Sequence, residues 1–268
     1  MKRVVFITGI SSGFGKCISE FLARKDYTVY GTSRKQIDIT LPIKVLNADV
    51  TDIDSVKQAV ETILKIEGRI DVLINNAGMG ISGPIEFTSH EDIKLQMDTN
   101  FMGIVNVIQS VLPSMRNQGT GTIINISSIG GIMGLPYQGY YSASKFAVEG
   151  MSEALRMELK PFNIKVVVVR PGDFFTNFTS NRKIGSNRAI NNPYQKQLAE
   201  TVSIIEKDER GGLNPEYLAR KIIKIIGRKN PRSCYVIASL EQKFAVILKR
   251  MLPDRWFSGI LASHYGIR

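Results

Sequence analysis

Short apolar runs alternate with amphipathic segments along most of this chain. The segments between the runs carry apolar residues every three or four positions, as at Val56, Val60 and Ile63, which is the period of an α-helix. Buried strands that alternate with helices predict a parallel sheet covered by helices on both faces. The expected strands cover residues 3–8, 27–32, 43–49, 70–75, 121–127, 164–170 and 233–238.

No linker, repeat or low-complexity tract divides the sequence, so we expect a single α/β domain over residues 1–268. The length and a hydrophobic content of 43% are sufficient for one continuous core. One long connection, about 173–213, follows the sixth strand. It ends before a helix expected at 214–228, which Asn214 and Pro215 would begin. Connections of this length are usually functional, so we expect a lid.

Composition excludes several other classes of protein. Two distant cysteines are too few for a disulfide framework or a metal site, which favours a cytoplasmic protein without metal. No stretch approaches the ~20 apolar residues of a transmembrane helix. The formal charge of +11 would attract phosphates, anionic lipids or nucleic acid. Because the basic residues are scattered and no nucleic-acid motif accompanies them, nucleic acid is not expected as a partner.

The stretch TGISSGFG, residues 8–15, directly follows the first expected strand and opens a helix. Glycines let the backbone approach a pyrophosphate, and the free N–H groups at the helix start attract it. A glycine-rich turn without a ligand is the alternative, but the order of strand, glycines and helix favours a phosphate-binding loop. The glycines stand at positions 9, 13 and 15, one step wider at the first gap than in G-x-G-x-x-G.

Three ordered motifs carry a resemblance to a known family. T-G-x-x-x-G-x-G at 8–15, NNAG at 75–78 and Y-x-x-x-K at 141–145 resemble the motifs of the classical short-chain dehydrogenases/reductases. The resemblance covers essentially the whole chain. It implies a doubly wound Rossmann fold with a seven-stranded, mainly parallel sheet, a nicotinamide cofactor, and assembly as a homodimer or homotetramer.

The end of the second expected strand bears on the choice between NAD(H) and NADP(H). A carboxylate there would bind the adenosine ribose and repel a 2′-phosphate, whereas a cation would accept that phosphate. The sequence has Ser33 where NAD-preferring family members carry Asp, followed by Arg34 and Lys35. This favours NADP(H) over NAD(H), although a solvated basic turn is the alternative.

The resemblance also implies the remaining cofactor contacts. Asp49 and Val50 would lie at the adenine, and Thr176 at the nicotinamide carboxamide or a phosphate. The full predicted set is Thr8, Gly9, Ser11, Ser12, Gly13, Phe14, Gly15, Ser33, Arg34, Lys35, Asp49, Val50, Asn76, Ala77, Gly78, Tyr141, Lys145, Pro171, Gly172 and Thr176.

Reduction of a carbonyl requires a hydride at carbon and a proton at oxygen. Tyr141 and Lys145 are one helical turn apart, so both lie on one face. A fixed ammonium beside a tyrosine favours the phenolate and lowers the tyrosine pKa from its usual value near ~10. Tyr217 and Lys221 share the spacing but have no serine-bearing strand before them, so we interpret them as structural.

The resemblance assigns a role to four residues. Tyr141 is the general acid/base, Lys145 binds the nicotinamide ribose and lowers the tyrosine pKa, Ser128 orients the substrate, and Asn100 maintains a proton relay through a distorted helix. His90 and His264 fit no catalytic pattern and are expected at the surface or as helix caps.

The predicted substrate pocket is largely apolar, which favours a hydrophobic carbonyl compound or alcohol over a sugar. A lid that simply packs would also be apolar. The expected lining is Met79, Ile129, Ile132, Met133, Leu135, Pro136, Phe174, Phe175 and Phe178.

The carboxyl-terminal extension, about 240–268, looks similar to that of the 17β-hydroxysteroid and retinol dehydrogenase-like branch. An apolar stripe contains Phe244, Ile247, Leu248 and Met251, with basic residues off it. The pattern favours docking of this helix on its own domain, and peripheral contact with an anionic membrane is the alternative.

Together these features predict an NADP(H)-dependent oxidoreductase that interconverts a hydrophobic ketone or aldehyde and its alcohol. A non-catalytic NADP(H)-sensing regulator on the same fold is the first alternative, and the complete Asn, Ser, Tyr and Lys set argues against it. An epimerase or dehydratase of the extended branch is the second, disfavoured by the glycine spacing.

Overall fold

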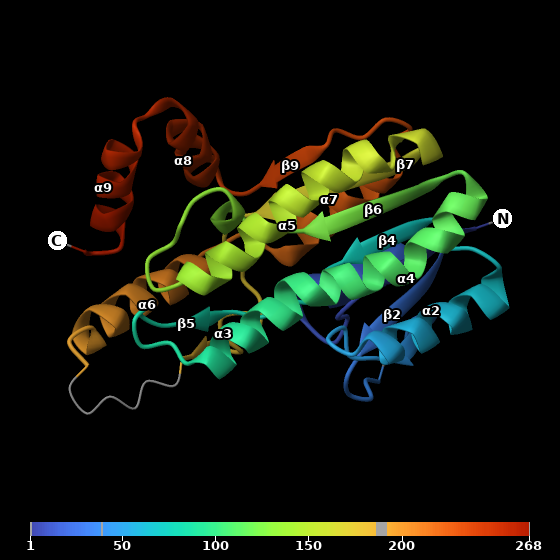
Figure 1. The fold of residues 1–268 in the computed structure, drawn as a ribbon, viewed down its shortest axis with the longest axis horizontal. Helices are drawn as coiled ribbons and strands as arrows, with labels where there is room; N and C mark the ends of the chain where they lie inside the picture. Colours follow the sequence, from blue (N-terminus) through green and yellow to red (C-terminus); the bar gives the residue numbers. More distant parts are fainter. Residues whose placement is uncertain (1, 39, 186–191, 268) are drawn as a thin grey trace.

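The centre of the protein, a computed structural model that describes residues 2–38, 40–185 and 192–267, is a seven-stranded sheet. Its strand order is β3-β2-β1-β4-β6-β7-β9 (Figure 1), and every neighbouring pair is parallel. The predicted strands and doubly wound Rossmann fold are thereby confirmed. The strands are β1 (Arg3–Ile7), β2 (Tyr27–Ser33), β3 (Ile43–Asn47), β4 (Val72–Asn75), β6 (Gly121–Ile126), β7 (Ile164–Pro171) and β9 (Cys234–Ile237).

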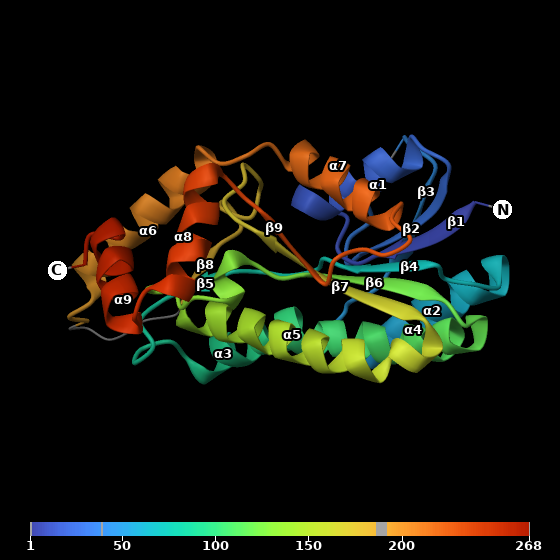
Figure 2. The same ribbon diagram turned by 90° about the horizontal axis from the view of Figure 1, so that it is seen from above.

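Helices cover both faces of the sheet, as Figure 2 shows. Strand β1 explains why, because Val4 and Phe6 are buried in one core cluster while Val5 and Ile7 are buried in the other. A strand that is apolar on both sides must be covered twice. One face carries α1 (Gly13–Ala23) and α7 (Pro215–Ile226), and the other carries α2 (Ile53–Glu67), α4 (Gly103–Gln118) and α5 (Gly139–Glu158).

Helix α7 begins where the sequence predicts. The Asn214 side chain accepts a hydrogen bond from the Glu216 N–H, and Pro215 occupies the first helical position. Proline fits there because the first N–H groups of a helix have no intrahelical partner.

The strand order places a cofactor site at one edge of the sheet. The chain moves outward from β1 to β3 and then returns to β4 on the other side of β1. Ligands of such sheets bind at the carboxyl ends of the strands, at this switch point.

The remaining elements lie beyond the carboxyl ends of the strands, on the left in Figure 1. Helices α8 and α9 join the fold through Val246 and Phe257, which form a third core cluster with Met133. Part of the predicted lid, residues 186–191, lies outside the described residues. No helix within the described parts of the chain is long and apolar enough to cross a membrane. The elements beyond the carboxyl ends are β5 (Ile81–Ser82), β8 (Lys183–Ile184), α3 (His90–Met97), α6 (Gln195–Arg210), α8 (Leu240–Met251) and α9 (Asp254–His264), with the short turns η1 (Asp98–Met102) and η2 (Ile129–Gly131). A further short turn, η3 (Lys160–Phe162), precedes β7 at the amino end of that strand.

A buried line of polar side chains joins β4, β6 and α5. The Asn75 amide donates to Asn125 Oδ1 over 2.8 Å, and the Asn125 amide donates to Ser152 Oγ over 2.9 Å. All three residues are buried. Buried amides must be hydrogen-bonded, so this line fixes helix α5 against the strand β6 that precedes Ser128.

Replacing Asn125→Ala is expected to lower the free energy of unfolding by roughly 2–4 kcal/mol, because the Asn75 amide and the Ser152 hydroxyl each lose a buried partner. Urea unfolding measures the change. Asn117→Ala, at an exposed position on α4, is the control and should change it by less than about 0.5 kcal/mol. Equal effects would contradict a stabilising role for the line.

Candidate active site

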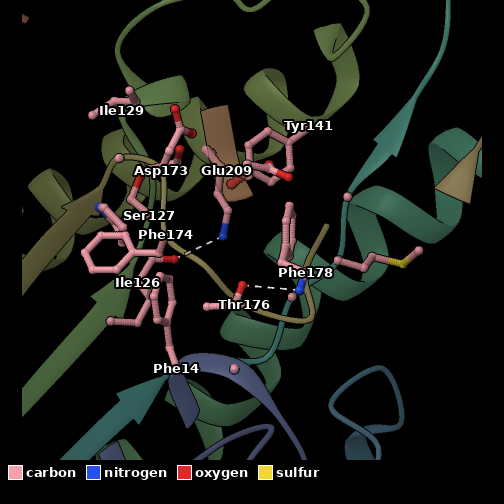
Figure 3. A pocket seen from close by; sticks show the side chains of 18 of the residues that line it. Phe14, Ile126, Ser127, Ile129, Tyr141, Asp173, Phe174, Thr176, Phe178 and Glu209 are labelled. Atoms are coloured by element: carbon pink, nitrogen blue, oxygen red, sulfur yellow. Dashed lines mark hydrogen bonds between the residues drawn. The ribbon is translucent and has the colours of Figure 1, made fainter. Parts of the chain in front are cut away.

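A cavity of about 1280 Å³ opens at the carboxyl ends of the strands. The ends of β2, β6 and β7 reach it at Ser33, Ile126 and Pro171. Elements distant in the sequence complete its wall, because α6, α8 and α9 also line it. Figure 3 shows that Tyr141 and Phe178 lie close together at this cavity, with Asp173 and Glu209 nearby.

The glycine loop fits tightly against the end of β4. Gly9 has a φ of 71°, and a Cβ there would lie 2.9 Å from the Ala77 Cα. A Cβ at Gly15 would collide with the Gly9 carbonyl oxygen. Ser12 caps α1 without a side-chain hydrogen bond, which leaves the first N–H groups of the helix for a ligand. This cradle fits the pyrophosphate of a dinucleotide.

Two predicted cofactor residues instead brace the loops. Thr8 Oγ1 accepts hydrogen bonds from the N–H groups of Asn76 and Ala77, each over 3.0 Å. The Asn76 amide donates to the Thr8 and Gly9 carbonyl oxygens, each over 2.9 Å. Thr8 and Gly15 do not line the cavity, whereas the other predicted cofactor residues do.

The cavity's adenosine end is formed by the turn after β2. The Ser33 hydroxyl donates to the Lys35 carbonyl oxygen over 2.7 Å and fixes the turn. Arg34 lies 3.8 Å from Asp49, and the Arg34 side chain is 73% exposed. An exposed pair at this distance is weak, so an incoming phosphate could take the guanidinium from Asp49.

Lys145 lies on α5 below Tyr141 and is buried. Its ammonium donates to the Ile126 carbonyl oxygen over 3.0 Å and lies 5.8 Å from the centre of the Tyr141 ring. Burial lowers the pKa of Lys145 to about 8, and Glu149 opposes that change. The four-residue spacing of Tyr141 and Lys145 therefore places both side chains at the cavity, as the sequence predicts.

The pKa of Tyr141 differs from the sequence-based expectation. Among the chain's own groups, burial raises this pKa, while a hydrogen bond with Ser128 and the charge of Arg182 lower it. Lys145 is not among the groups that lower it. The chain by itself thus keeps Tyr141 protonated, the form that can donate a proton to a carbonyl oxygen.

Asn100 lies behind the cavity, in the π-helical turn η1 between α3 and α4. Its Oδ1 accepts from the Met79 N–H over 2.8 Å, and its amide donates to the Met79 carbonyl over 3.0 Å and to Ser144 over 3.1 Å. The expected helix distortion is present. In this structure Asn100 joins the end of β4 to the helix that carries Tyr141.

The predicted substrate lining requires corrections. Phe175 is 64% exposed and does not line the cavity. Phe174 lines it but packs edge-on against Phe14, with the ring centres 5.0 Å apart. Ile132 and Pro136 do not line it either. Ile132 instead packs against the cluster of Met133, Val246 and Phe257. The remaining expected lining residues are found at the cavity: Met79, Ile129, Met133, Leu135 and Phe178.

Sequence reasoning missed an acidic group at the same cavity. Glu209 pairs with Arg182, and Asp208 pairs with His264 over 3.0 Å. His264, expected at the surface or as a cap, therefore also lines the cavity. These partners come from the lid and from the end of the chain, so no local motif could have indicated them.

Asp173, directly after the P-G turn, is the third carboxylate. The Gln242 amide donates to it over 2.6 Å, and its own N–H donates to Gln242 Oε1 over 3.1 Å. No cation among the described residues forms an ion pair with it. Burial, followed by Glu209 and Asp208, raises the pKa of Asp173 to about 6. The only feature of the sequence that could have indicated Asp173 as a site residue is its position directly after Pro171 and Gly172, which were predicted to contact the cofactor.

The family to which the chain belongs is shown by comparison. A model of the family described as short chain dehydrogenase matches residues 3–186. The chain belongs to the short-chain dehydrogenase family. A 3-ketodihydrosphingosine reductase of Bacteroides thetaiotaomicron is 50% identical over 266 residues, 99% of each chain. An NADPH-dependent 3-dehydrocapnine reductase of Ornithobacterium rhinotracheale is 33% identical, over 96% of this chain and 95% of that protein.

A solved structure agrees with these relatives. A short-chain dehydrogenase from Streptomyces avermitilis has a TM-score of 0.79 and 30% identity, over 91% of each chain. This short-chain dehydrogenase is therefore an oxidoreductase that uses NAD(P)(H), and its substrate is a carbonyl compound or the corresponding alcohol. The glycine cradle, the basic turn and Lys145 fit such a cofactor.

Proposed function

We propose that this short-chain dehydrogenase reduces a long-chain 2-amino ketone, 3-ketodihydrosphingosine or a close analogue, with NADPH. One observation carries the proposal beyond the family: an unpaired carboxylate, Asp173, lies in the same cavity as Tyr141 and apolar side chains. Ketodihydrosphingosine has an ammonium group beside its ketone and a long alkyl chain. The 50% identical reductase supports the same substrate.

Tyr141 and Ser128 would hold the carbonyl oxygen. Bound NADPH supplies the hydride to the carbonyl carbon. Tyr141 donates its proton to the oxygen, and its raised pKa favours the protonated form needed at that moment. Lys145 would hold the nicotinamide ribose and, as an ammonium, stabilise the phenolate that proton transfer leaves behind.

The rest of the substrate matches the far end of the cavity. This part of the lining is apolar and belongs to one cluster of packed side chains: Ile129, Met133, Leu135, Leu248 and Leu261. Burying an alkyl chain against such a surface contributes about 0.8 kcal/mol per CH₂ group. A sugar would leave its hydroxyl groups without partners there.

Preference for NADPH is supported by the turn after β2. Arg34 and Lys35 line the cavity where the adenosine would lie, and the buried Ser33 brings no carboxylate there. The 33% identical relative is also NADPH-dependent by name.

A purely nucleotide-sensing role, the alternative considered from the sequence, is not favoured. A sensor would need the glycine cradle but not a lined substrate cavity next to Tyr141. The predicted homodimer or homotetramer stays a prediction.

Replacing Tyr141→Phe should reduce turnover of 3-ketodihydrosphingosine by roughly 100- to 10,000-fold, because the proton donor is lost. NADPH binding, followed by cofactor fluorescence, should be retained. Tyr140→Phe is the matched control, since Tyr140 donates to the Ile85 carbonyl over 3.3 Å, outside the cavity. Retained turnover in Tyr141→Phe would disprove proton donation by this residue.

Replacing Arg34→Asp should raise the KM for NADPH by about 10- to 100-fold and improve use of NADH, because a charge-assisted contact to phosphate becomes a repulsion. The measurement is initial rates with each cofactor. Arg24→Asp, at another exposed arginine, is the control and should change neither the KM for NADPH nor the rate with NADH. An unaltered preference in Arg34→Asp would contradict the role of the turn.

Replacing Asp173→Asn should lower kcat/KM for the amino ketone by about 10- to 100-fold, because the ammonium loses its carboxylate. For the same ketone without the amino group the change should be small. With the wild-type protein, kcat/KM for the amino ketone should fall as the pH drops below about 6, where Asp173 becomes protonated. Asp173→Asn should lack this decrease; equal losses on both ketones would contradict amine recognition.

A further inference from the structure

Helices α8 and α9 have two apolar faces. The inner face of α8 lines the cavity at Ala245 and Leu248. The outer face exposes Phe244 by 59%, Ile247 by 51% and Met251 by 75%. Of the stripe that was expected to dock on the protein's own domain, only Leu248 faces inward, whereas Phe244, Ile247 and Met251 are exposed. Packing of α8 on the protein's own domain accounts for the apolar residues of its inner face, but it leaves the exposed apolar residues of its outer face without a function.

Helix α9, which follows α8 and contacts it, also exposes apolar side chains. Trp256 is 67% exposed, while Phe257 next to it is buried. Two arginines, Arg250 and Arg255, are exposed beside these apolar residues. Aromatic and aliphatic side chains flanked by arginines are typical of helices that lie in a membrane interface.

A basic groove of about 370 Å³ borders the same helix. It is lined by α7, by β9, by the loop between them and by Lys243 of α8. The chain passes from α7 through β9 to α8 in Figures 1 and 2. The groove contains no carboxylate among the described residues that line it. Its five cationic residues are Lys221, Lys224, Arg228, Arg232 and Lys243.

These cations are not neutralised by the protein. Within the described parts of the chain, none of the five forms an ion pair. Lys221 instead lies 5.0 Å from the centre of the Tyr217 ring, and Arg228 lies 5.9 Å from that of Tyr235. The tyrosine and lysine that repeat the catalytic spacing thus lie at this groove.

The groove and the outer face form one continuous surface. Lys243 lines the groove, and Phe244, the next residue, belongs to the exposed apolar face. A second copy of the chain would bring the same positive charge against the groove. A small soluble anion would leave the apolar face uncovered. An anionic bilayer matches both parts, since its phosphates attract cations and its acyl boundary accepts apolar side chains.

We propose that this groove and the outer face of α8 and α9 form a docking surface for an anionic lipid bilayer. The headgroup phosphates bind in the groove, and Phe244, Ile247 and Trp256 enter the acyl boundary. Because the inner faces of these helices line the cavity, docking places the cavity beside the lipid. The proposal does not depend on which carbonyl compound is reduced.

The test is flotation of the full-length protein with vesicles of phosphatidylcholine alone or with about a third phosphatidylglycerol. Binding is expected only to the anionic vesicles and should weaken as salt rises, because salt screens surface charge. Lys221→Gln, Arg228→Gln and Lys243→Gln together should reduce binding by tenfold or more, at about 1 kcal/mol per cation.

A triple variant with the same change in net charge is the control. Lys25→Gln, Lys65→Gln and Lys160→Gln alter three exposed lysines away from the groove and should leave binding nearly unchanged. An equal loss in both triple variants would overturn the proposal, because it would show attraction by overall charge alone.

A second pair of variants tests the apolar face. Phe244→Ser with Ile247→Ser should reduce vesicle binding, whereas Met157→Ser with Phe162→Ser, at exposed positions elsewhere, should not. Rates with a water-soluble ketone should stay unchanged in every variant and show that each is folded.

A shift from dimer to monomer in Phe244→Ser with Ile247→Ser, without an effect on vesicles, would assign the face to a second copy and overturn the proposal. Binding of inorganic phosphate in the groove without any binding to vesicles would also overturn the proposal.

Discussion

A buried ammonium at the end of β6 connects the fold to the chemistry. Lys145 can remain there because the Ile126 carbonyl accepts its hydrogen bond, even though burial lowers its pKa to about 8. That position requires α5 to be fixed against the sheet. The Asn125 to Ser152 hydrogen bond fixes the helix at its middle, and the Asn100 to Ser144 hydrogen bond fixes it near its start. The sheet thus determines where Tyr141 meets the cavity.

Charge is separated between two sides of the molecule's carboxyl-terminal part. The cavity is lined by charges of both signs, with Asp173, Asp208 and Glu209 at its lid side, whereas the groove outside α8 has only cations among its described charged residues. The net charge of +11 and the scattered basic residues of the sequence give no sign of this arrangement. In the proposed function the inner carboxylate would bind the substrate ammonium, and in the proposed docking surface the outer cations would bind anionic lipid.

Most of the fold could be predicted from the sequence, because each strand is a local apolar run and each helix has a local period. The cofactor loop and the Tyr141 to Lys145 pair could also be predicted, since a strand end or one helical turn brings their residues together. The parts that failed depend on packing between distant segments. Phe175 was expected in the cavity, and Phe244, Ile247 and Met251 were expected to dock on the domain, but all four are exposed. Only the packing of the lid and tail decides which side of these segments is buried. The ion pairs of Glu209 with Arg182 and of Asp208 with His264 also depend on how the lid and the tail pack, so the sequence did not indicate them.

The proposed reaction is reduction of a long-chain 2-amino ketone by hydride transfer from NADPH. The most direct measurement uses NADPH in which both hydrogens at the nicotinamide C4 are deuterium, with 3-ketodihydrosphingosine as substrate and mass spectrometry of the product. The account predicts dihydrosphingosine with one deuterium at C3 and one NADP⁺ formed for each molecule reduced. Unlabelled product, or no consumption of NADPH with this ketone when simpler ketones are reduced, would contradict it.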